Sequence, residues 1–66
     1  MWAYAIIQDG YGKEYQYKCS EYDAIYDRVL ALTDDIQEAI EIASWCEIAS
    51  VGERYLGNGV TVDICE

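Results

Sequence analysis

The sequence predicts an α+β fold, in which a small antiparallel sheet of about four strands carries one or two helices on one face. The chain has 66 residues, which is enough for a single domain spanning residues 1–66. Apolar and polar residues alternate over residues 13–19 and 60–64, as in half-buried strands, whereas the middle of the chain has apolar residues at helical spacing. The resulting order, β-β-α-α-β-β, predicts helices packed together on one side of a sheet.

The first part of the chain predicts a β-hairpin. Residues 2–8 are rich in aromatic and β-branched side chains, which favours a strand. Residues 9–12 have the sequence Asp-Gly-Tyr-Gly, in which two glycines permit a tight turn. Residues 13–19 then alternate and place three side chains on one face: Tyr15, Tyr17 and Cys19. Residues 2–19 are therefore expected to pair as two antiparallel strands.

Residues 21–32 favour a helix, although a short buried strand over residues 28–33 is the alternative. Ser20 is the expected N-cap, with Asp23 three residues later in a capping-box arrangement. Apolar residues recur at the spacing of one helical face: Tyr22, Ile25, Tyr26, Val29 and Leu30. Asp23 and Asp27 are then expected to point outward, together with Ala31.

A second helix is expected to begin near Thr33 or Asp34, either of which can cap it, and to continue toward Gly52. Carboxylates at its start suit the positive end of the helix dipole. The expected inward stripe has five members: Ile36, Ala39, Ile40, Ala43 and Cys46. Ile42 and Ala49 are expected on its flank.

Residues 53–66 predict a second hairpin. Two apolar segments flank the sequence Gly57-Asn58-Gly59, and Asn-Gly is a strong signal for a tight turn between strands. Alternation over the last segment places three side chains in the core: Val60, Val62 and Ile64.

The composition excludes several classes of function. Thirteen acidic residues against four basic ones give a net charge of −9, which disfavours binding to DNA, RNA or an anionic membrane. The apolar content of 53% is too high for a disordered acidic tail. No apolar stretch is long enough to span a membrane, and residues 1–4 lack the features of a signal peptide. A cytoplasmic protein is therefore expected.

The sequence predicts no enzyme, no cofactor and no metal. The chain has no His, so it lacks the Ser-His and Cys-His pairs of nucleophilic catalysis. Its three cysteines, Cys19, Cys46 and Cys65, are scattered, which argues against zinc and favours small buried thiols. The chain contains no phosphate-binding glycine motif.

The outer face of the second helix is the expected binding surface. Helical projection gathers five polar residues there: Asp34, Gln37, Glu38, Glu41 and Ser44. Trp45 and Ile48 fall among them, so Trp45 is either an exposed binding hot spot or a core residue covered by another element. Glu47 projects onto the apolar stripe, where a buried carboxylate would need hydrogen bonds or a cation.

The acidic residues are concentrated in the middle of the chain. Residues 20–53 contain nine of them and one opposing cation, Arg28. Five lie between Asp34 and Glu47, which is about 20 Å of helix. One DNA strand carries roughly six phosphates over that length, so the helix presents charge at nearly the density of phosphates.

The chain resembles the small phage and mobile-element proteins that inhibit bacterial defence systems. The resemblance rests on its length, its net charge, its acidic helices and the lack of a catalytic set of residues. This anti-CRISPR and anti-restriction class includes DNA mimics. The resemblance implies an inhibitor in the bacterial cytoplasm that occupies a basic groove of a nucleic-acid-binding protein, for example a CRISPR effector complex. The resemblance assigns no residue roles, and the partner-binding residues expected from the outward faces of the two helices are Asp23, Asp27, Asp34, Asp35, Glu38, Glu41 and Trp45.

Two alternatives remain at this level. The chain is either a monomer or a homodimer, and exposed aromatic side chains could make it a self-associating structural or assembly module of phage type. The acidity could also serve solubility alone.

Overall fold

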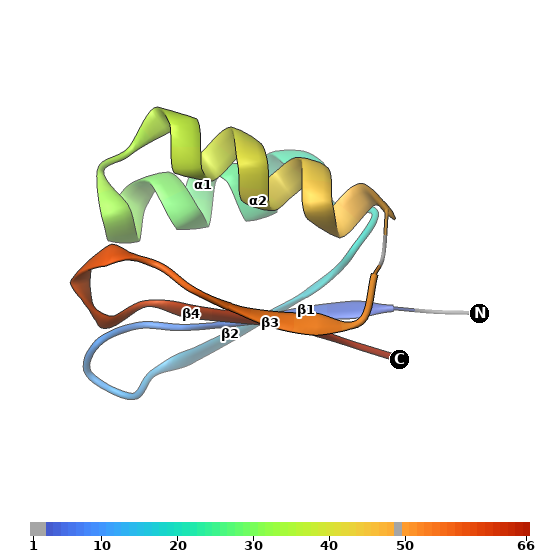
Figure 1. The fold of residues 1–66 in the computed structure, drawn as a ribbon, viewed down its shortest axis with the longest axis horizontal. Coiled ribbons are helices and arrows are strands. Elements are labelled where there is room, and N and C mark those ends of the chain that lie inside the picture. The colour runs from blue at the N-terminus through green and yellow to red at the C-terminus, as the bar shows by residue number, and fades with distance from the viewer. Residues whose placement is uncertain (1–2, 49) are drawn as a thin grey trace.

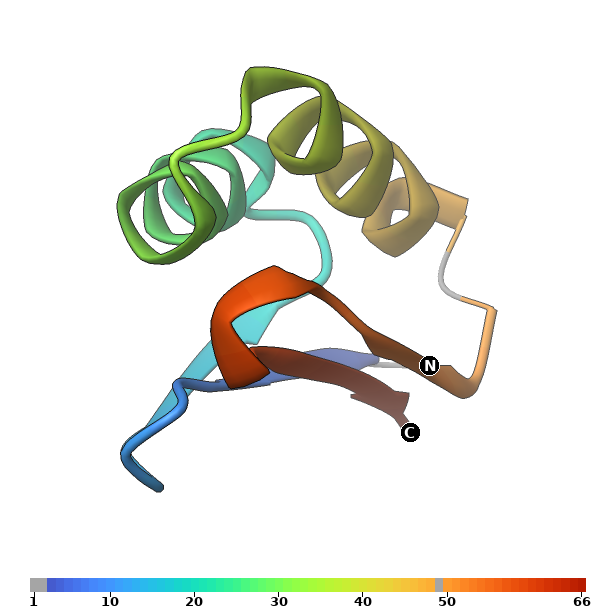
Figure 2. The same cartoon turned by 60° about the vertical axis from the view of Figure 1, so that its left-hand side comes forward.

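A computed structural model describes residues 3–48 and 50–66 of the chain. Two helices lie side by side on one face of a four-stranded antiparallel sheet, in the order β-β-α-α-β-β (Figure 1, Figure 2). The predicted α+β fold is therefore confirmed. The opposite face of the sheet is not covered by any element of the described chain (Figure 1).

The sheet has the strand order β2-β1-β4-β3, in which every neighbouring pair is antiparallel. Its four strands are β1 (Tyr4–Gln8), β2 (Glu14–Lys18), β3 (Gly52–Tyr55) and β4 (Thr61–Cys65). Both predicted hairpins are confirmed. The central pair joins the first strand to the last, with Tyr4 opposite Cys65.

Helix α1 (Tyr22–Thr33) confirms the helical interpretation of residues 21–32 and excludes the strand alternative. Ile25 and Val29 are fully buried, as the apolar spacing predicts. The predicted capping box is wrong, because Glu21 occupies the N-cap position and no side chain caps the helix there. The Glu21 carboxylate instead accepts a hydrogen bond from the backbone N–H of Lys18, at the end of β2.

A two-residue connection separates the helices. Asp34 adopts the left-handed conformation (φ 55°) and its N–H donates to the Leu30 carbonyl, which ends α1. Asp35 then caps the second helix, because its Oδ1 accepts the N–H of Glu38 at 3.1 Å. The prediction of Thr33 or Asp34 as the cap is therefore wrong. The chain reverses at Asp34, and this leaves Asp35 at the start of the helix.

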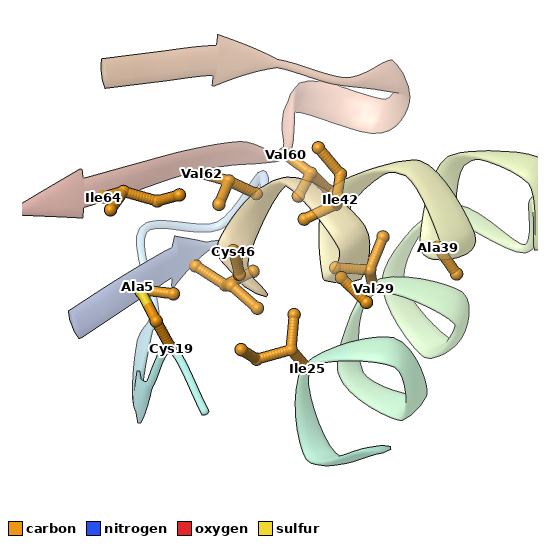
Figure 3. Close-up of a cluster of buried hydrophobic side chains, with 12 residues drawn as sticks. Ala5, Cys19, Ile25, Val29, Ala39, Ile42, Cys46, Val60, Val62 and Ile64 are labelled. Carbon is orange, nitrogen blue, oxygen red and sulfur yellow. The ribbon is translucent and has the colours of Figure 1, made fainter. Parts of the chain in front are cut away.

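Helix α2 (Ile36–Ile48) buries a different side from the one predicted. Ala39, Ala43 and Cys46 are buried as expected. Ile42 is fully buried rather than on the flank, in the same cluster as Val60 and Val62 (Figure 3). The helix is thus rotated toward Ile42, and this rotation moves Ile36 and Ile40 to the surface.

Two further expectations for α2 are wrong. Glu47 is exposed, because the rotation of the helix carries it out of the apolar side, so its carboxylate needs no buried partner. The helix ends at Ile48, and Gly52 begins β3 instead of stopping the helix. The expected positions of Ala49 on the flank of α2 and of Trp2 in the first strand lie outside the described residues.

The core lies between the two helices and the sheet (Figure 3). The predicted strand residues Val60, Val62 and Ile64 are buried, as is Cys19. The full cluster consists of Ala5, Ile7, Cys19, Ile25, Val29, Ala39, Ile42, Ala43, Cys46, Val60, Val62 and Ile64.

The two hairpin turns touch each other at one end of the sheet. A short 3₁₀ turn, η1 (Gly57–Gly59), links β3 to β4, and Asn58 within it has a positive φ of 61°. The Asn58 side chain donates to the carbonyl of Leu32 at 3.4 Å, near the end of α1. Gly10, in the first turn, lies against the Asn58 carbonyl so closely that a Cβ would come within 2.7 Å of its oxygen. This position therefore requires glycine.

Candidate partner-binding surface

Two predicted binding residues of α1 point away from the sheet. Asp23 and Asp27 lie one turn apart and are exposed, on the side of the helix opposite Ile25 and Val29. No hydrogen bond or ion pair to either side chain is found among the described residues. Both carboxylates are therefore available to a partner in solution.

The acidic residues of α2 and its connection complete a surface on the helical layer. Asp34, Asp35 and Glu41 are exposed, and Glu38 is half-buried in the first turn of the helix. One oxygen of Asp35 is used as the helix cap, so this residue contributes less to binding than to the start of α2. We call the six carboxylates of the two helices and their connection the acidic helical surface: Asp23, Asp27, Asp34, Asp35, Glu38 and Glu41.

Arg28, the one cation within residues 20–53, is directed toward the sheet. Its guanidinium lies over the ring of Tyr15 at 4.0 Å, and its Nε donates to the hydroxyl of Tyr17 at 2.9 Å. This hydrogen bond raises the pKa of Arg28. Two tyrosines of β2 thus hold Arg28, and Asp27 lines the same surface hollow as Tyr17 and Arg28.

Trp45 is neither a free surface aromatic nor a fully buried one. Its ring is half-buried and packs against the core cluster. The guanidinium of Arg54, from β3, lies over the ring at 4.5 Å from its centre. The predictions of an exposed hot spot and of a core residue are thus each correct for part of the Trp45 side chain. A partner that approached this side would contact the indole together with Arg54.

A shallow, open surface groove lies on the outer side of α2, and the sequence alone does not define it. Six residues line this groove, which we call the α2 groove: Ile40, Glu41, Ser44, Trp45, Ile48 and Arg54. The sequence predicts Trp45 and Ile48 on this side of α2 but places Ile40 in the core, so only part of the apolar lining is predicted. A signal was present in the sequence, because eight of the 13 residues of α2 are apolar, more than one side of a helix can bury.

The uncovered face of the sheet carries a pair of carboxylates. Glu53 of β3 lies directly opposite Asp63 of β4, and the hydroxyl of Tyr55 donates to Glu53. Hydrogen bonds from Tyr55 and then Asp63 lower the pKa of Glu53. Burial raises the pKa of Asp63, and the hydrogen bond and negative charge of the neighbouring Glu53 raise it further. The two groups thus favour sharing a proton, and this pair lies on the face opposite the helices.

The cysteines are free thiols in the structure. Cys19 and Cys46 are buried, and burial raises the pKa of Cys46 to about 12. A thiol with so high a pKa is a poor nucleophile at neutral pH. Among the residues that the structure describes, no group of three or more His, Cys, Asp or Glu side chains could hold a metal ion.

Comparison with known proteins gives no relative: no family model, curated protein or solved structure matches this chain. Neither α1 nor α2, the two helices of the described chain, has the length and apolar character needed to cross a membrane.

Proposed function

We propose that this protein is a non-catalytic inhibitor that binds a basic, nucleic-acid-binding protein through its acidic helical surface. The observation that carries the proposal is a separation of charge. Asp23, Asp27 and Glu41 are exposed on the helical layer, whereas Arg28 and Arg54 are held over aromatic rings at its two sides. Six carboxylates thus outnumber two cations that are each engaged by an aromatic ring, and such an acidic layer is what a groove of Lys and Arg would attract.

The spacing of the acidic groups supports an electrostatic mechanism. The 13 residues of α2 extend for about 20 Å, and the adjacent α1 adds a second row of carboxylates. In a groove that otherwise holds a phosphate backbone, these rows would pair with the same Lys and Arg side chains. Binding would exclude nucleic acid sterically, and its rate would depend strongly on salt.

The biological target that we propose is a bacterial defence complex, with a CRISPR effector as the first candidate. In this proposal the protein acts in the cytoplasm of a bacterial host. Support comes from the small size, the net charge of −9 and the acidic helices, which this chain shares in character with anti-defence proteins.

Competition for nucleic acid tests the proposal. A guide-loaded CRISPR effector is mixed with a fluorescent target duplex, and release of the duplex is followed by anisotropy at low and high salt. The double variant Asp27→Lys with Glu41→Lys should weaken competition about tenfold or more, because two exposed carboxylates become repulsive. The matched control, Glu14→Lys with Glu66→Lys, makes the same change in net charge at exposed positions off the helices.

The two double variants give a clear decision. If the control weakens competition as much as the helical variant, net charge rather than the acidic helical surface determines binding. If the unaltered protein releases no duplex from single-subunit or multisubunit effectors, or from restriction enzymes in the same assay, the proposed function is wrong.

Self-association as a structural or assembly module is the second candidate. Tyr11 and Tyr55 favour it, because they are the aromatic residues of the described chain that are mostly exposed, at 99% and 75%. Repulsion between two copies that each carry −9 opposes it. Sedimentation velocity at micromolar concentration separates the candidates, since a stable dimer supports the module and a monomer supports the inhibitor.

A further inference from the structure

Three isoleucines of α2 remain on the surface. Ile36, Ile40 and Ile48 are 60%, 41% and 73% exposed. They are separated by four or eight residues, so they follow one another along the outer side of the helix. Single exposed aliphatic residues are common on protein surfaces, but a row of them marks an interaction site more often.

The α2 groove gives this row a defined shape. Ile40 and Ile48 supply its apolar surface, and Trp45 with the overlying Arg54 forms one wall. Ile40 and Ile48 are two helical turns apart, about 12 Å along the axis. A groove of this length fits the aliphatic side chains of a short segment that lies along α2.

The charges around the row indicate what can occupy it. Glu41 and Arg54 both line the groove, but the guanidinium of Arg54 is held over the ring of Trp45. Glu47 is exposed beyond the lining residues, on the other side of Ile40 around the helix, so the surroundings are acidic on balance. Nucleic acid would be repelled by these carboxylates and has no aliphatic side chains to offer. A second copy of the chain would bring a further charge of −9 to the same surface. The complementary occupant is cationic and aliphatic at the same time.

We infer that the α2 groove binds a basic amphipathic segment of the partner protein, with aliphatic side chains on Ile40 and Ile48 and flanking Lys or Arg on Glu41 and Glu47. This inference rests on the proposed function and specifies its partner. Contact with carboxylates alone would give steering and salt dependence, whereas the isoleucines add affinity that salt does not screen.

Two synthetic helical peptides test this inference. They have equal length and equal Lys content, but one carries Leu along one face and the other carries Ser at the same positions. The protein should bind the Leu peptide about tenfold more tightly, and this ratio should persist in high salt. Isothermal titration calorimetry measures both affinities.

Variants then assign the difference to the groove. Ile40→Ser with Ile48→Ser should abolish the preference for the Leu peptide and retain the weak, salt-sensitive binding of the Ser peptide. Glu41→Gln with Glu47→Gln should weaken both peptides. Tyr11→Ser is the control, since it removes an exposed apolar side chain in the β1–β2 turn. Circular dichroism checks folding, and Ile48→Ser alone serves if the double variant unfolds.

The outcomes separate this inference from the proposed function. Equal affinity for the two peptides, with competition for the duplex intact, overturns the inference and leaves the proposed function standing. Binding to neither peptide together with no competition overturns both. A dimer that Ile48→Ser dissociates also overturns the inference, because the groove would then be occupied by a second copy.

Discussion

The guanidinium group of Arg54 lies over the indole ring of Trp45, 4.5 Å from its centre, and links β3 to the outer side of α2. The contact closes the edge of the core where the sheet meets the helical layer. The guanidinium also covers one face of Trp45, the tryptophan that the sequence predicts as a binding anchor. In the proposed complex, Trp45 would act as an anchor only if the partner packed beside Arg54 or displaced it.

Loss of this cation should therefore be visible in both stability and fluorescence. Arg54→Gln should lower the free energy of unfolding by about 0.5–1 kcal/mol, since the cation–π contact lies at a partly exposed site. In a Trp2→Phe background, the emission of Trp45 should shift as its ring gains contact with water. Urea titration measures the first effect. Arg54→Lys retains the cation and should lose less free energy of unfolding. If Arg54→Gln changed neither the stability nor the Trp45 emission, the contact would be incidental.

The contact between the two hairpin turns predicts a difference between two glycines. Gly10→Ala places a methyl group within 2.7 Å of the Asn58 carbonyl oxygen, so the turns must separate, at a cost of about 1–3 kcal/mol. Gly57→Ala is the control, because nothing lies within 4 Å of the added methyl group. Thermal unfolding followed by circular dichroism should show a lower Tm for Gly10→Ala alone. Equal Tm values would mean that the turns are not in contact in solution.

The rotation of α2 can be tested by removing one methyl group from each of two isoleucines, in separate variants. Ile42→Val removes a methyl group from a fully buried side chain and should cost about 0.5–1.5 kcal/mol. Ile36→Val makes the same change at a mostly exposed side chain and should stay within about 0.5 kcal/mol. Chemical denaturation measures both. If Ile36→Val cost more stability than Ile42→Val, the buried stripe would be the one that the sequence predicts, with Ile36 inside.

The carboxylate pair on the open face of the sheet predicts a pH dependence. Because the pKa of Asp63 is raised in the folded state, its ionised form opposes folding at neutral pH. Asp63→Asn should therefore stabilise the protein at pH 7 by about a few tenths of a kcal/mol, the scale of a cross-strand like-charge pair. The wild-type protein regains this stability as the pH falls through the raised pKa of Asp63, so the advantage of the variant should shrink toward acid.

Thermal unfolding of both proteins between pH 7 and about pH 4 measures this dependence. Glu66→Gln, at an exposed terminal position, controls for the change in net charge. The pKa of Glu53 is shifted in the opposite direction, below its usual value. The ionised Glu53 therefore stabilises the folded protein, and this stabilisation is lost only at still lower pH. An advantage of Asp63→Asn that grows with acidity would contradict the assignment.

Strands β2 and β4 could be predicted from the sequence because apolar and polar residues alternate along them, and this pattern fits only one assignment of the buried face. In the last hairpin, polar residues separate Val60, Val62 and Ile64, so one face of the strand is apolar and must be the buried one. The helical layer is different. Apolar residues surround α2, and the choice between Ile36 and Ile42 depends on how the helix meets α1 and the sheet. Spacing along the chain does not contain that information.

The candidate site was predictable in charge but not in shape. Asp23, Asp27 and Glu41 project outward from the periodicity alone, and the structure places them on the surface. The α2 groove depends on the rotation of the helix and on Arg54, which reaches Trp45 from another element. A contact between α2 and β3 lies beyond any local pattern. The prediction of Thr33 or Asp34 as the cap of α2 was wrong for a similar reason, since neighbouring Thr and Asp residues can cap equally well until the reversal at Asp34 selects Asp35.

The pairing of β1 with β4 has a consequence for the time course of folding. Each hairpin can close locally, but the ladder from Tyr4 to Cys65 forms only after the whole helical middle has been looped out. A nascent chain that has not yet released β4 exposes an unpaired edge of β1 and the apolar side chains of Ala5 and Ile7. Such long-range pairing slows folding. We expect the sheet to be completed after synthesis of β4, and the strong negative charge then keeps the unfinished chains apart.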